Sequence, residues 1–362
     1  MVVLEWMPKV VFAFLLTVIW IKLLESHACR IGLVDKPSGR KHHEGAVPLI
    51  GGLAICASFL FSVLFLDVSL QHYHGLFAAM ALLVAMGIGD DLHDLPAIRR
   101  LLTQIVAAAL IITISDLKLR GLGDLTGLGN IGLGIWSAPF TIFCVVGVIN
   151  GLNMVDGLDG LAGGIAFVAI FWLTVLVVPL VGWSGLDAKI MLLLLGAIAG
   201  FLFFNLRHPW RRCASVFMGD AGSMVLGLIL AWFMIDFTQR EEQIFVPIIA
   251  VWILGLPVLD TLSVMIRRIL SGNSPFHGDR GHIHHILLSY GRSDVQTVYI
   301  LLVFSTLLGG IGVAAWYLGV PEHVLFYGFV MLGGLYFCGS FYALRGLKKV
   351  SLLQRSPGIG RS

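Results

Sequence analysis

Charged residues are scarce in this sequence. Only 12% of its 362 residues are Asp, Glu, Lys or Arg, about half the share of roughly 25% that soluble proteins carry. Mean hydropathy is +0.92, and apolar runs of roughly 17–25 residues, the length that a membrane-spanning helix needs, recur along the chain. The shortage of charge excludes a soluble globular protein, and the apolar runs predict an all-α, polytopic membrane protein.

Cysteine is sparse and long polar segments are missing. The five cysteines have no paired spacing, which argues against a disulfide framework, and we expect reduced thiols. The longest polar segments, 26–45 and 267–294, are interpreted as loops, so residues 1–362 form a single integral membrane domain. The first apolar stretch lacks a cleavage site and is expected to remain as an anchor.

Hydropathy predicts about eleven membrane-spanning helices, near 8–25, 46–66, 75–89, 101–115, 136–152, 161–181, 188–204, 221–237, 244–266, 295–318 and 323–344. Basic residues favour the cytoplasmic side of a membrane. With the N-terminus outside, 18 of the 24 Lys and Arg residues fall inside. The C-terminus is then cytoplasmic, and the inner loops lie near 26–45, 90–100, 153–160, 205–220 and 267–294.

Six aspartates and one asparagine gather at the inner ends of predicted spans. They are Asp90, Asp91 and Asp94 in GIGDDLHD, Asn153, Asp156 and Asp159 in NMVDGLDG, and Asp220 in VFMGDAGS. Carboxylates at a membrane boundary are costly unless they pair, bind a cation or take part in catalysis. Their hard oxygens, interleaved with glycines that let backbone approach a ligand, predict a site for Mg²⁺ and phosphate. Taken alone, the first motif also fits a solvated helix end and Asp220 a helix cap.

The last inner loop is rich in histidine and arginine. Its candidate phosphate ligands are Arg268, Arg280, His282, His284 and His285. Because no cysteine is near and the acids elsewhere suit a hard metal, we favour a grip on a pyrophosphate over a zinc site or a simple surface cluster. The first inner loop, with Lys36, fits phosphate binding and the ordinary positive-inside bias equally well.

Five motifs follow one another along the chain: GLVDKP at 32–37, GIGDDLHD at 87–94, NMVDGLDG at 153–160, VFMGDAGS at 216–223 and SPF…DRGHIHH at 274–285. Together they resemble the polyprenyl-phosphate N-acetylhexosamine-1-phosphate transferase family. The peptidoglycan branch of that family carries adjacent histidines in the last loop, whereas this sequence has His282-Ile-His284-His285. The chain therefore looks most like the enterobacterial branch that transfers GlcNAc-1-phosphate.

The resemblance implies a phosphoryl transfer in the bacterial inner membrane, with the active site on the cytoplasmic side. The phosphate of undecaprenyl phosphate would attack the β-phosphorus of UDP-GlcNAc and release UMP, with Mg²⁺ or Mn²⁺ as the cofactor. The product would initiate a lipid-linked surface polysaccharide such as O antigen or enterobacterial common antigen. The lipid bilayer is a further partner, no nucleic acid is expected, and the sequence allows an oligomer.

The resemblance also implies roles for individual residues. Catalytic roles go to Asp90, Asp91, Asp156 and Asp159, metal binding to Asp156, Asp220 and Asp91, and substrate binding to Asn153, Lys36, Arg268, Arg280, His282, His284 and His285. A phosphate monoester has a second pKa of about 6 and needs no strong base at pH 7. Asp90 is therefore expected to orient the lipid phosphate rather than to deprotonate it. Asp94 has no assigned role.

Other interpretations fit parts of the sequence. Another UDP-HexNAc could serve as donor in the same chemistry. Gly87-Ile-Gly89-Asp90 matches the GxGD pattern of intramembrane aspartyl proteases, but the Tyr-Asp dipeptide often found in those enzymes is missing. An ion-coupled transporter would need acids near the bilayer midplane, for which Asp236 and Asp260 are the candidates. The glycine-rich loop 116–134 holds a formal GxGxxG fingerprint, yet it lies between two spans rather than in a βαβ unit.

Overall fold

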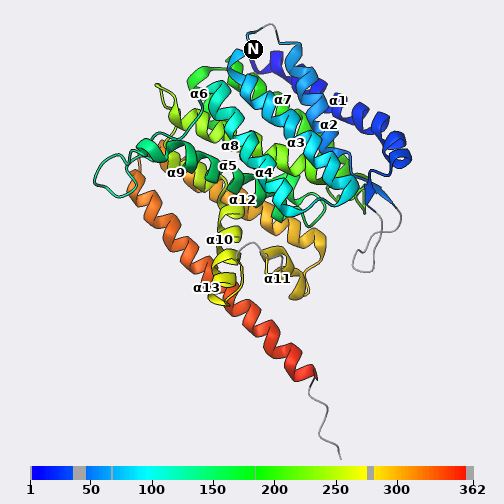
Figure 1. Ribbon diagram of the computed structural model, residues 1–362, viewed down its shortest axis with the longest axis vertical. Helices are drawn as coiled ribbons and strands as arrows, with labels where there is room; N and C mark the ends of the chain where they lie inside the picture. The colour runs from blue at the N-terminus through cyan, green and yellow to red at the C-terminus, as the bar shows by residue number, and fades with distance from the viewer. Residues whose placement is uncertain (1, 36–45, 67, 184, 275–280, 356–362) are drawn as a thin grey trace, which may run out of the picture.

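The computed structural model describes residues 2–35, 46–66, 68–183, 185–274 and 281–355. Regular structure in these residues is almost entirely helical (Figure 1). The elements are α1 (Val2–Ile31), β1 (Val34–Asp35), β2 (Val47–Pro48), α2 (Gly51–Leu64), η1 (Gln71–Tyr73), α3 (His74–His93), α4 (Ala97–Ser115), η2 (Gly134–Trp136), α5 (Ser137–Val155), α6 (Leu161–Val181), α7 (Leu186–Asn205), α8 (Gly219–Gln239), α9 (Pro247–Ile253), α10 (Gly255–Leu270), α11 (Ile283–Ser289), α12 (Asp294–Tyr317) and α13 (Glu322–Arg355). Strands β1 and β2 form one short antiparallel pair.

Nine helices in the described residues are each long and apolar enough to cross a membrane. They are α1, α3, α4, α5, α6, α7, α8, α12 and α13. The predicted second span is the shorter helix α2, of 14 residues, and the predicted ninth span is divided into α9 and α10, which meet at 82°. The all-α, polytopic architecture is confirmed, while the count of eleven spans and their orientation stay predictions.

The bend between α9 and α10 lies at Leu254. Pro247 and Pro257 each occupy the first turn of one of the two helices. A proline in the first turn sacrifices no helical hydrogen bond, because the N–H at that position has no partner within the helix. After the bend α10 packs against α12 and α13, and α11 lies beside the same helices (Figure 1).

Several helices continue past the apolar runs that predicted them. Asp90 and Asp91 lie in the last turn of α3, Asn153 in the last turn of α5, and Asp220 in the first turn of α8. The expected loops near 90–100 and 153–160 are therefore shorter at their start, because backbone hydrogen bonding outlasts the hydrophobic pattern. As a result, helix ends rather than loops hold these four side chains.

Helix α8 is the centre of the bundle. Its most apolar stretch of 18 residues is entirely buried, whereas only 17% of the corresponding stretch of α1 is buried. Helices α2, α3, α5 and α6 pack against it. Small residues allow the close approach: a Cβ on Gly52 of α2 would lie 2.1 Å from the Cα of Gly222 in α8, and a Cβ on Gly87 of α3 would lie 2.2 Å from the Cα of Ala221.

This packing predicts the effect of adding one methyl group. Gly52→Ala places a carbon against the backbone of Gly222, which cannot move aside as a flexible side chain would. We expect a loss of about 1–3 kcal/mol of stability, measured as a lower unfolding temperature of the purified protein in detergent. Gly147→Ala is the matched control, since a Cβ at that helical glycine meets nothing within 4 Å. Equal unfolding temperatures for the two variants would contradict the proposed backbone contact.

Candidate active site

Three polar residues from three helices meet at one end of the bundle. The backbone N–H of Asp220 donates to Oδ1 of Asp91 at 3.0 Å. Nδ2 of Asn153 donates to Oδ1 of Asp220 at 2.7 Å and to Oγ of Ser223 at 2.9 Å. The C-terminal ends of α3 and α5 and the start of α8 therefore converge, as the sequence predicts for these motifs.

Arg100 joins this group and was missed in the sequence as a site residue. Its Nη1 donates to Oδ2 of buried Asp90 at 3.0 Å and lies 3.7 Å from Oδ2 of Asp220. The other oxygen of Asp90 accepts from the backbone N–H of Leu95 at 2.7 Å. An arginine in the first turn of a helix interacts unfavourably with the helix dipole. The position of Arg100 at the start of α4 was the one feature of the sequence that could have indicated its role.

One carboxylate oxygen of Asp91 accepts no hydrogen bond from the described residues. Among the described residues its Oδ2 is buried and has no hydrogen-bond partner, which is costly for an acceptor. Gly219, with φ +73°, lies directly beside it, and a Cβ there would come within 2.7 Å of Oδ2. The close approach of the α8 N-terminus to Asp91 thus depends on glycine. A hard cation is the kind of ligand that would satisfy such an oxygen.

No group of three or more His, Cys, Asp or Glu side chains in the described part of the chain is arranged as a ready-made metal site. Mg²⁺ commonly binds through one or two carboxylates, several waters and the phosphates of its substrate. The hard oxygens of Asp91 and Asp220, held by one hydrogen bond at the junction of α3 and α8, fit that mode of binding.

Asp156 and Asp159 follow α5 and differ in their surroundings. Asp156 is accessible to solvent, yet protein atoms crowd it; this partial desolvation and the charges of Asp220, Asp159 and Asp91 raise its pKa to about 7. Asp159 instead accepts from Nε of Arg207 at 2.7 Å, and Nη1 of Arg207 lies 3.0 Å from Asp294. Asp156 therefore faces the acidic group, whereas Asp159 ties the loop to the end of α7 and the start of α12.

The histidine segment packs against the NMVDGLDG motif. His284 is buried, and a Cβ on Gly157 would lie 2.7 Å from its Nε2. Its ring lies 4.2 Å from the ring of His285 and stacks on that of His282 at 5.8 Å. Burial, helped by the neighbouring His285 and His282, lowers the pKa of His284 to about 4. His284 is therefore neutral at pH 7, and a positive charge for an anion has to come from other groups.

The remaining predicted ligands are less closely defined. Arg268 is buried in the last turn of α10, and Lys36 and Arg280 lie outside the described residues. Asp94 is exposed and ends α3 in a left-handed conformation, with φ 48°. Asp94 thus terminates the helix, and none of the hydrogen bonds or ion pairs in the described part of the chain joins its side chain to the other acids.

The two acids that favoured a transporter are both hydrogen-bonded within the protein. Asp236 pairs with Arg240 and with His72, 2.9 Å away, at the opposite end of α8 from Asp220, and Arg240 also binds Asp187 at 2.7 Å. Asp260 pairs with His282 at 2.8 Å. Both acids thus have partners within the protein, which removes the observations that favoured an ion pathway.

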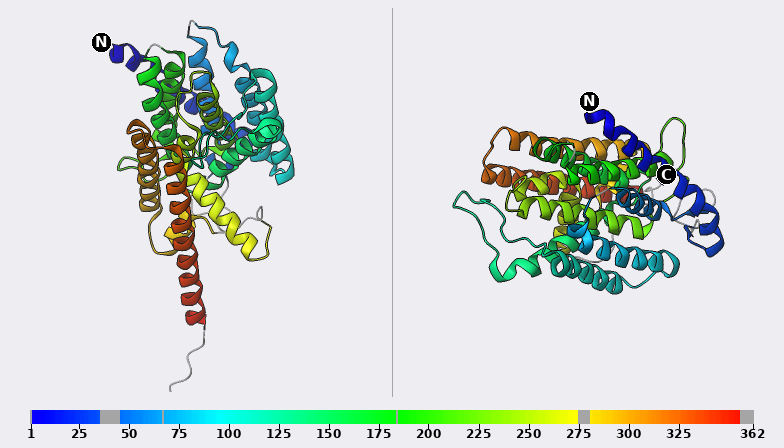
Figure 2. Two further views of the ribbon diagram at one scale, coloured as in Figure 1. Left: turned by 90° about the vertical axis from the view of Figure 1, so that its left-hand side faces the viewer. Right: turned by 90° about the horizontal axis from the view of Figure 1, so that it is seen from above.

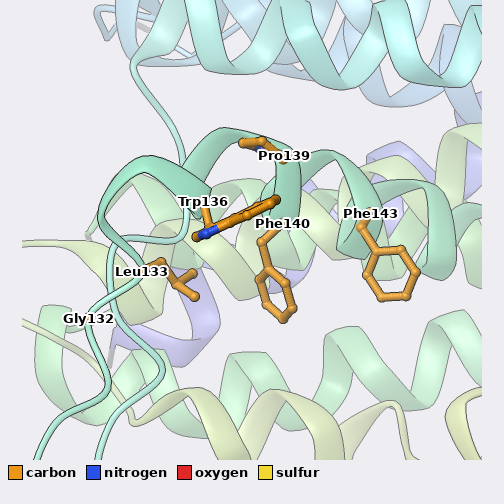
Figure 3. A pocket seen from close by; sticks show the side chains of 6 residues that line it. All are labelled: Gly132, Leu133, Trp136, Pro139, Phe140 and Phe143. Carbon is orange, nitrogen blue, oxygen red and sulfur yellow. The ribbon is translucent and has the colours of Figure 1, made fainter.

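A shallow hollow of about 420 Å³ lies far from these acids. Gly132, Leu133, Trp136, Pro139, Phe140 and Phe143 line it (Figure 3). It adjoins the N-terminal end of α5, whereas Asn153 is at the C-terminal end. The preceding glycine-rich segment is a hairpin, with Gly121 and Gly132 paired as an antiparallel bridge, and it projects from the side of the bundle (Figure 2). The hollow has no titratable lining residue, and the hairpin is no dinucleotide fold.

Comparison with known proteins identifies relatives of this chain. The chain is similar to undecaprenyl-phosphate alpha-N-acetylglucosaminyl 1-phosphate transferases. For that of Salmonella typhi the identity is 35%, over 91% of this chain and 89% of the relative. For that of Escherichia coli K12 it is 34%, over 89% and 88%, and for that of Haemophilus influenzae 32%, over 90% and 91%. Residues 73–238 match the model of glycosyl transferase family 4.

The chain belongs to glycosyl transferase family 4. The region matched by the family 4 model includes Asp91, Asn153 and Asp220, which meet in the structure. Arg100 also falls inside that region, whereas the histidine segment follows it in the chain. The contact between Gly157 and His284 nevertheless joins the segment to the family 4 region.

That contact generates a prediction. In Gly157→Ala the new methyl group has to displace the buried ring of His284, and we expect transferase activity to fall about 10-fold or more, because small misplacements at a site are costly. Activity is measured as UMP release in detergent. Gly132→Ala is the control, because a Cβ there meets nothing within 4 Å. Full activity in Gly157→Ala would show that the position of His284 is unimportant.

Proposed function

We propose that this protein transfers GlcNAc-1-phosphate from UDP-GlcNAc to undecaprenyl phosphate. The products are undecaprenyl-pyrophosphoryl-GlcNAc and UMP, and the reaction initiates a lipid-linked surface polysaccharide. Three relatives named for this activity match it over 89–91% of its length. The observation that carries the proposal is the hydrogen-bonded convergence of Asp91, Asn153 and Asp220 at the ends of membrane-spanning helices. The alternative is that the natural donor is another UDP-HexNAc.

The reaction joins two anions. An oxygen of the lipid phosphate forms a bond to the β-phosphorus of UDP-GlcNAc, and the bond from that phosphorus to the bridging oxygen breaks, so UMP leaves with the electron pair. Catalysis then consists mainly of aligning the reactants and neutralising their repulsion. Arg100, fixed by Asp90 and near Asp220, places a guanidinium where a phosphate can approach. Asp90 therefore acts by orienting Arg100.

A divalent cation, Mg²⁺ or Mn²⁺, completes the proposed site. Asp90, Asp91, Asp156 and Asp220 crowd one end of the bundle, and among the described ion pairs only Arg100 brings a positive charge to them. Asp91 and Asp220 would hold the cation, with Asp156 beside them. When bound, it neutralises charge on the donor diphosphate. Arg268, Arg280 and the histidines 282, 284 and 285 would grip the same diphosphate, with the positive charge coming from the arginines, and Lys36 would contact a phosphate from the first inner loop.

The proposed setting is the inner membrane, with the site facing the cytoplasm, where nucleotide sugars are found. The isoprenoid tail of the acceptor is too apolar for water and lies among the helices within the bilayer. Its phosphate would therefore reach the helix ends from the side, while UDP-GlcNAc enters from the water. This geometry explains why the acids lie at a membrane boundary rather than at its midplane.

Asp220→Asn tests the cation proposal. The substitution keeps the volume and the helix start but removes a charge, and we expect UMP release to fall at least about 100-fold while the unfolding temperature in detergent is kept. Asp116→Asn is the matched control: Asp116 is exposed at the opposite end of α4 and pairs with Lys118 and Arg120. Near-normal turnover in Asp220→Asn would refute the assignment of Asp220 as a ligand of the cation. In the wild-type protein, transfer from UDP-MurNAc-pentapeptide but not from UDP-GlcNAc would overturn the proposed donor.

A second prediction concerns Arg100. Arg100→Gln leaves the carboxylates of Asp90 and Asp220 without their shared cation, and we expect kcat/KM to fall about 100-fold. Arg100→Lys keeps the charge but loses the planar fork, so we expect an intermediate loss. Steady-state kinetics with undecaprenyl phosphate as the varied substrate distinguish these variants. Equal kcat/KM in all three proteins would remove Arg100 from the proposed mechanism.

A further inference from the structure

A buried carboxylate in α10 makes more contacts than an ion pair needs. Asp260 is 1% exposed and lies beside the buried apolar residues Leu256, Leu259 and Val264 of the same helix. Its Oδ2 lies 2.8 Å from Nδ1 of His282. Its Oδ1 accepts from the backbone N–H of Ile283 at 2.9 Å and from the hydroxyl of Tyr336 in α13 at 3.0 Å. The mechanism proposed above gives Asp260 and Tyr336 no role.

These three contacts constrain the orientation and the tautomer of the His282 ring. The N–H of Ile283 and the hydroxyl of Tyr336 both donate to Oδ1, and an ionised Asp260 accepts the third hydrogen bond at Oδ2 when Nδ1 of His282 carries the proton. In that arrangement Nδ1 of His282 is the donor, and Nε2 is the nitrogen that can face a ligand. Asp260 thus holds the ring through the hydrogen bond with Nδ1 of His282. It also holds the neighbouring backbone through the hydrogen bond from the N–H of Ile283.

A second set of contacts lies one helical turn further along the same two helices. Nη1 of Arg267 donates to Oγ of Ser263 at 2.8 Å and to Oγ of Ser340 in α13 at 2.6 Å. Nη2 of Arg267 donates to the carbonyl oxygen of Gly281 at 2.5 Å. Helices α10 and α13 thus hold the start of the histidine segment at two consecutive levels.

We propose that Asp260 and Tyr336 are positioning residues that fix the tautomer and orientation of His282 for the diphosphate of the nucleotide-sugar donor. This inference rests on the proposed function, since it assigns a substrate to the ring. Neither residue touches the reacting atoms. Asp260 acts through His282, and Tyr336 acts through Asp260.

Steady-state kinetics test the proposal in the full-length protein. In Asp260→Asn one of the three donors meets an amide N–H, and we expect the KM for UDP-GlcNAc to rise about 10- to 100-fold, with the KM for undecaprenyl phosphate unchanged. Tyr336→Phe removes one of the two donors to Oδ1 and should raise the same KM about 3-fold. Tyr342→Phe is the matched control, because Tyr342 lies on the same helix, is 69% exposed and forms no hydrogen bond with any of the described residues. A loss of kcat with both KM values unchanged would indicate a smaller folded fraction and would overturn the proposal.

A double mutant separates positioning from other effects. If Asp260 acts through His282, adding Asp260→Asn to His282→Ala should change kcat/KM by less than about 2-fold, since coupled residues are not additive. Additive losses would refute the coupling. If His282→Ala alone keeps normal kinetics, the role given to the histidines in the proposed function fails instead.

A spectroscopic measurement is independent of the reaction. Nitrogen-15 NMR of histidine-labelled protein in nanodiscs should show His282 protonated at Nδ1 in the wild type and in Tyr342→Phe, and a mixture of tautomers in Asp260→Asn. The His282→Ala sample assigns the signal. An unchanged His282 signal in Asp260→Asn would overturn the positioning role, whether or not UMP release is observed.

Discussion

A carboxylate at the edge of an apolar bilayer is costly unless a partner or a cation neutralises it, and this constraint separates the acids of the chain into two groups. At one end of α8, Asp187 and Asp236 share Arg240, and His72 supports them. At the other end, the described contacts bring only Arg100 to Asp90 and Asp220, with Asp91 and Asp156 nearby. The first group is a structural ion network that fixes the helix, and the excess negative charge of the second makes it the proposed cation site.

Glycine makes the second group geometrically attainable. Gly52 and Gly222 bring α2 and α8 into backbone contact, and Gly219 brings the start of α8 against Asp91. Gly157 leaves room for the ring of His284. In each case a methyl group would overlap a neighbouring atom, so the glycines of the motifs serve close approach rather than flexibility. Helix packing and site geometry consequently rest on the same residues.

The histidine segment shows how a loop-like motif is held by elements that the motif does not contain. His282 is tied to α10 through Asp260, and Asp260 is tied to α13 through Tyr336. Gly281 is tied to the same pair of helices through Arg267 and Ser340. Helix α13, which runs past the rest of the bundle (Figure 1), thus contributes to the site although it supplies no proposed ligand.

Hydropathy predicted the all-α, polytopic architecture from the sequence alone, because bilayer thickness imposes the length of a span and the cost of buried charge keeps acids near its ends. The same logic predicted that Asp91, Asn153 and Asp220 would meet. The sequence did not indicate that Arg100 binds Asp90, that Arg207 binds Asp159, or that Asp260 orients His282. Those pairings depend on how helices rotate about their axes and on the 82° bend between α9 and α10. The packing of small residues between helices decides that rotation. The hydropathy pattern of a helix cannot predict it, because the pattern does not depend on which helix packs alongside.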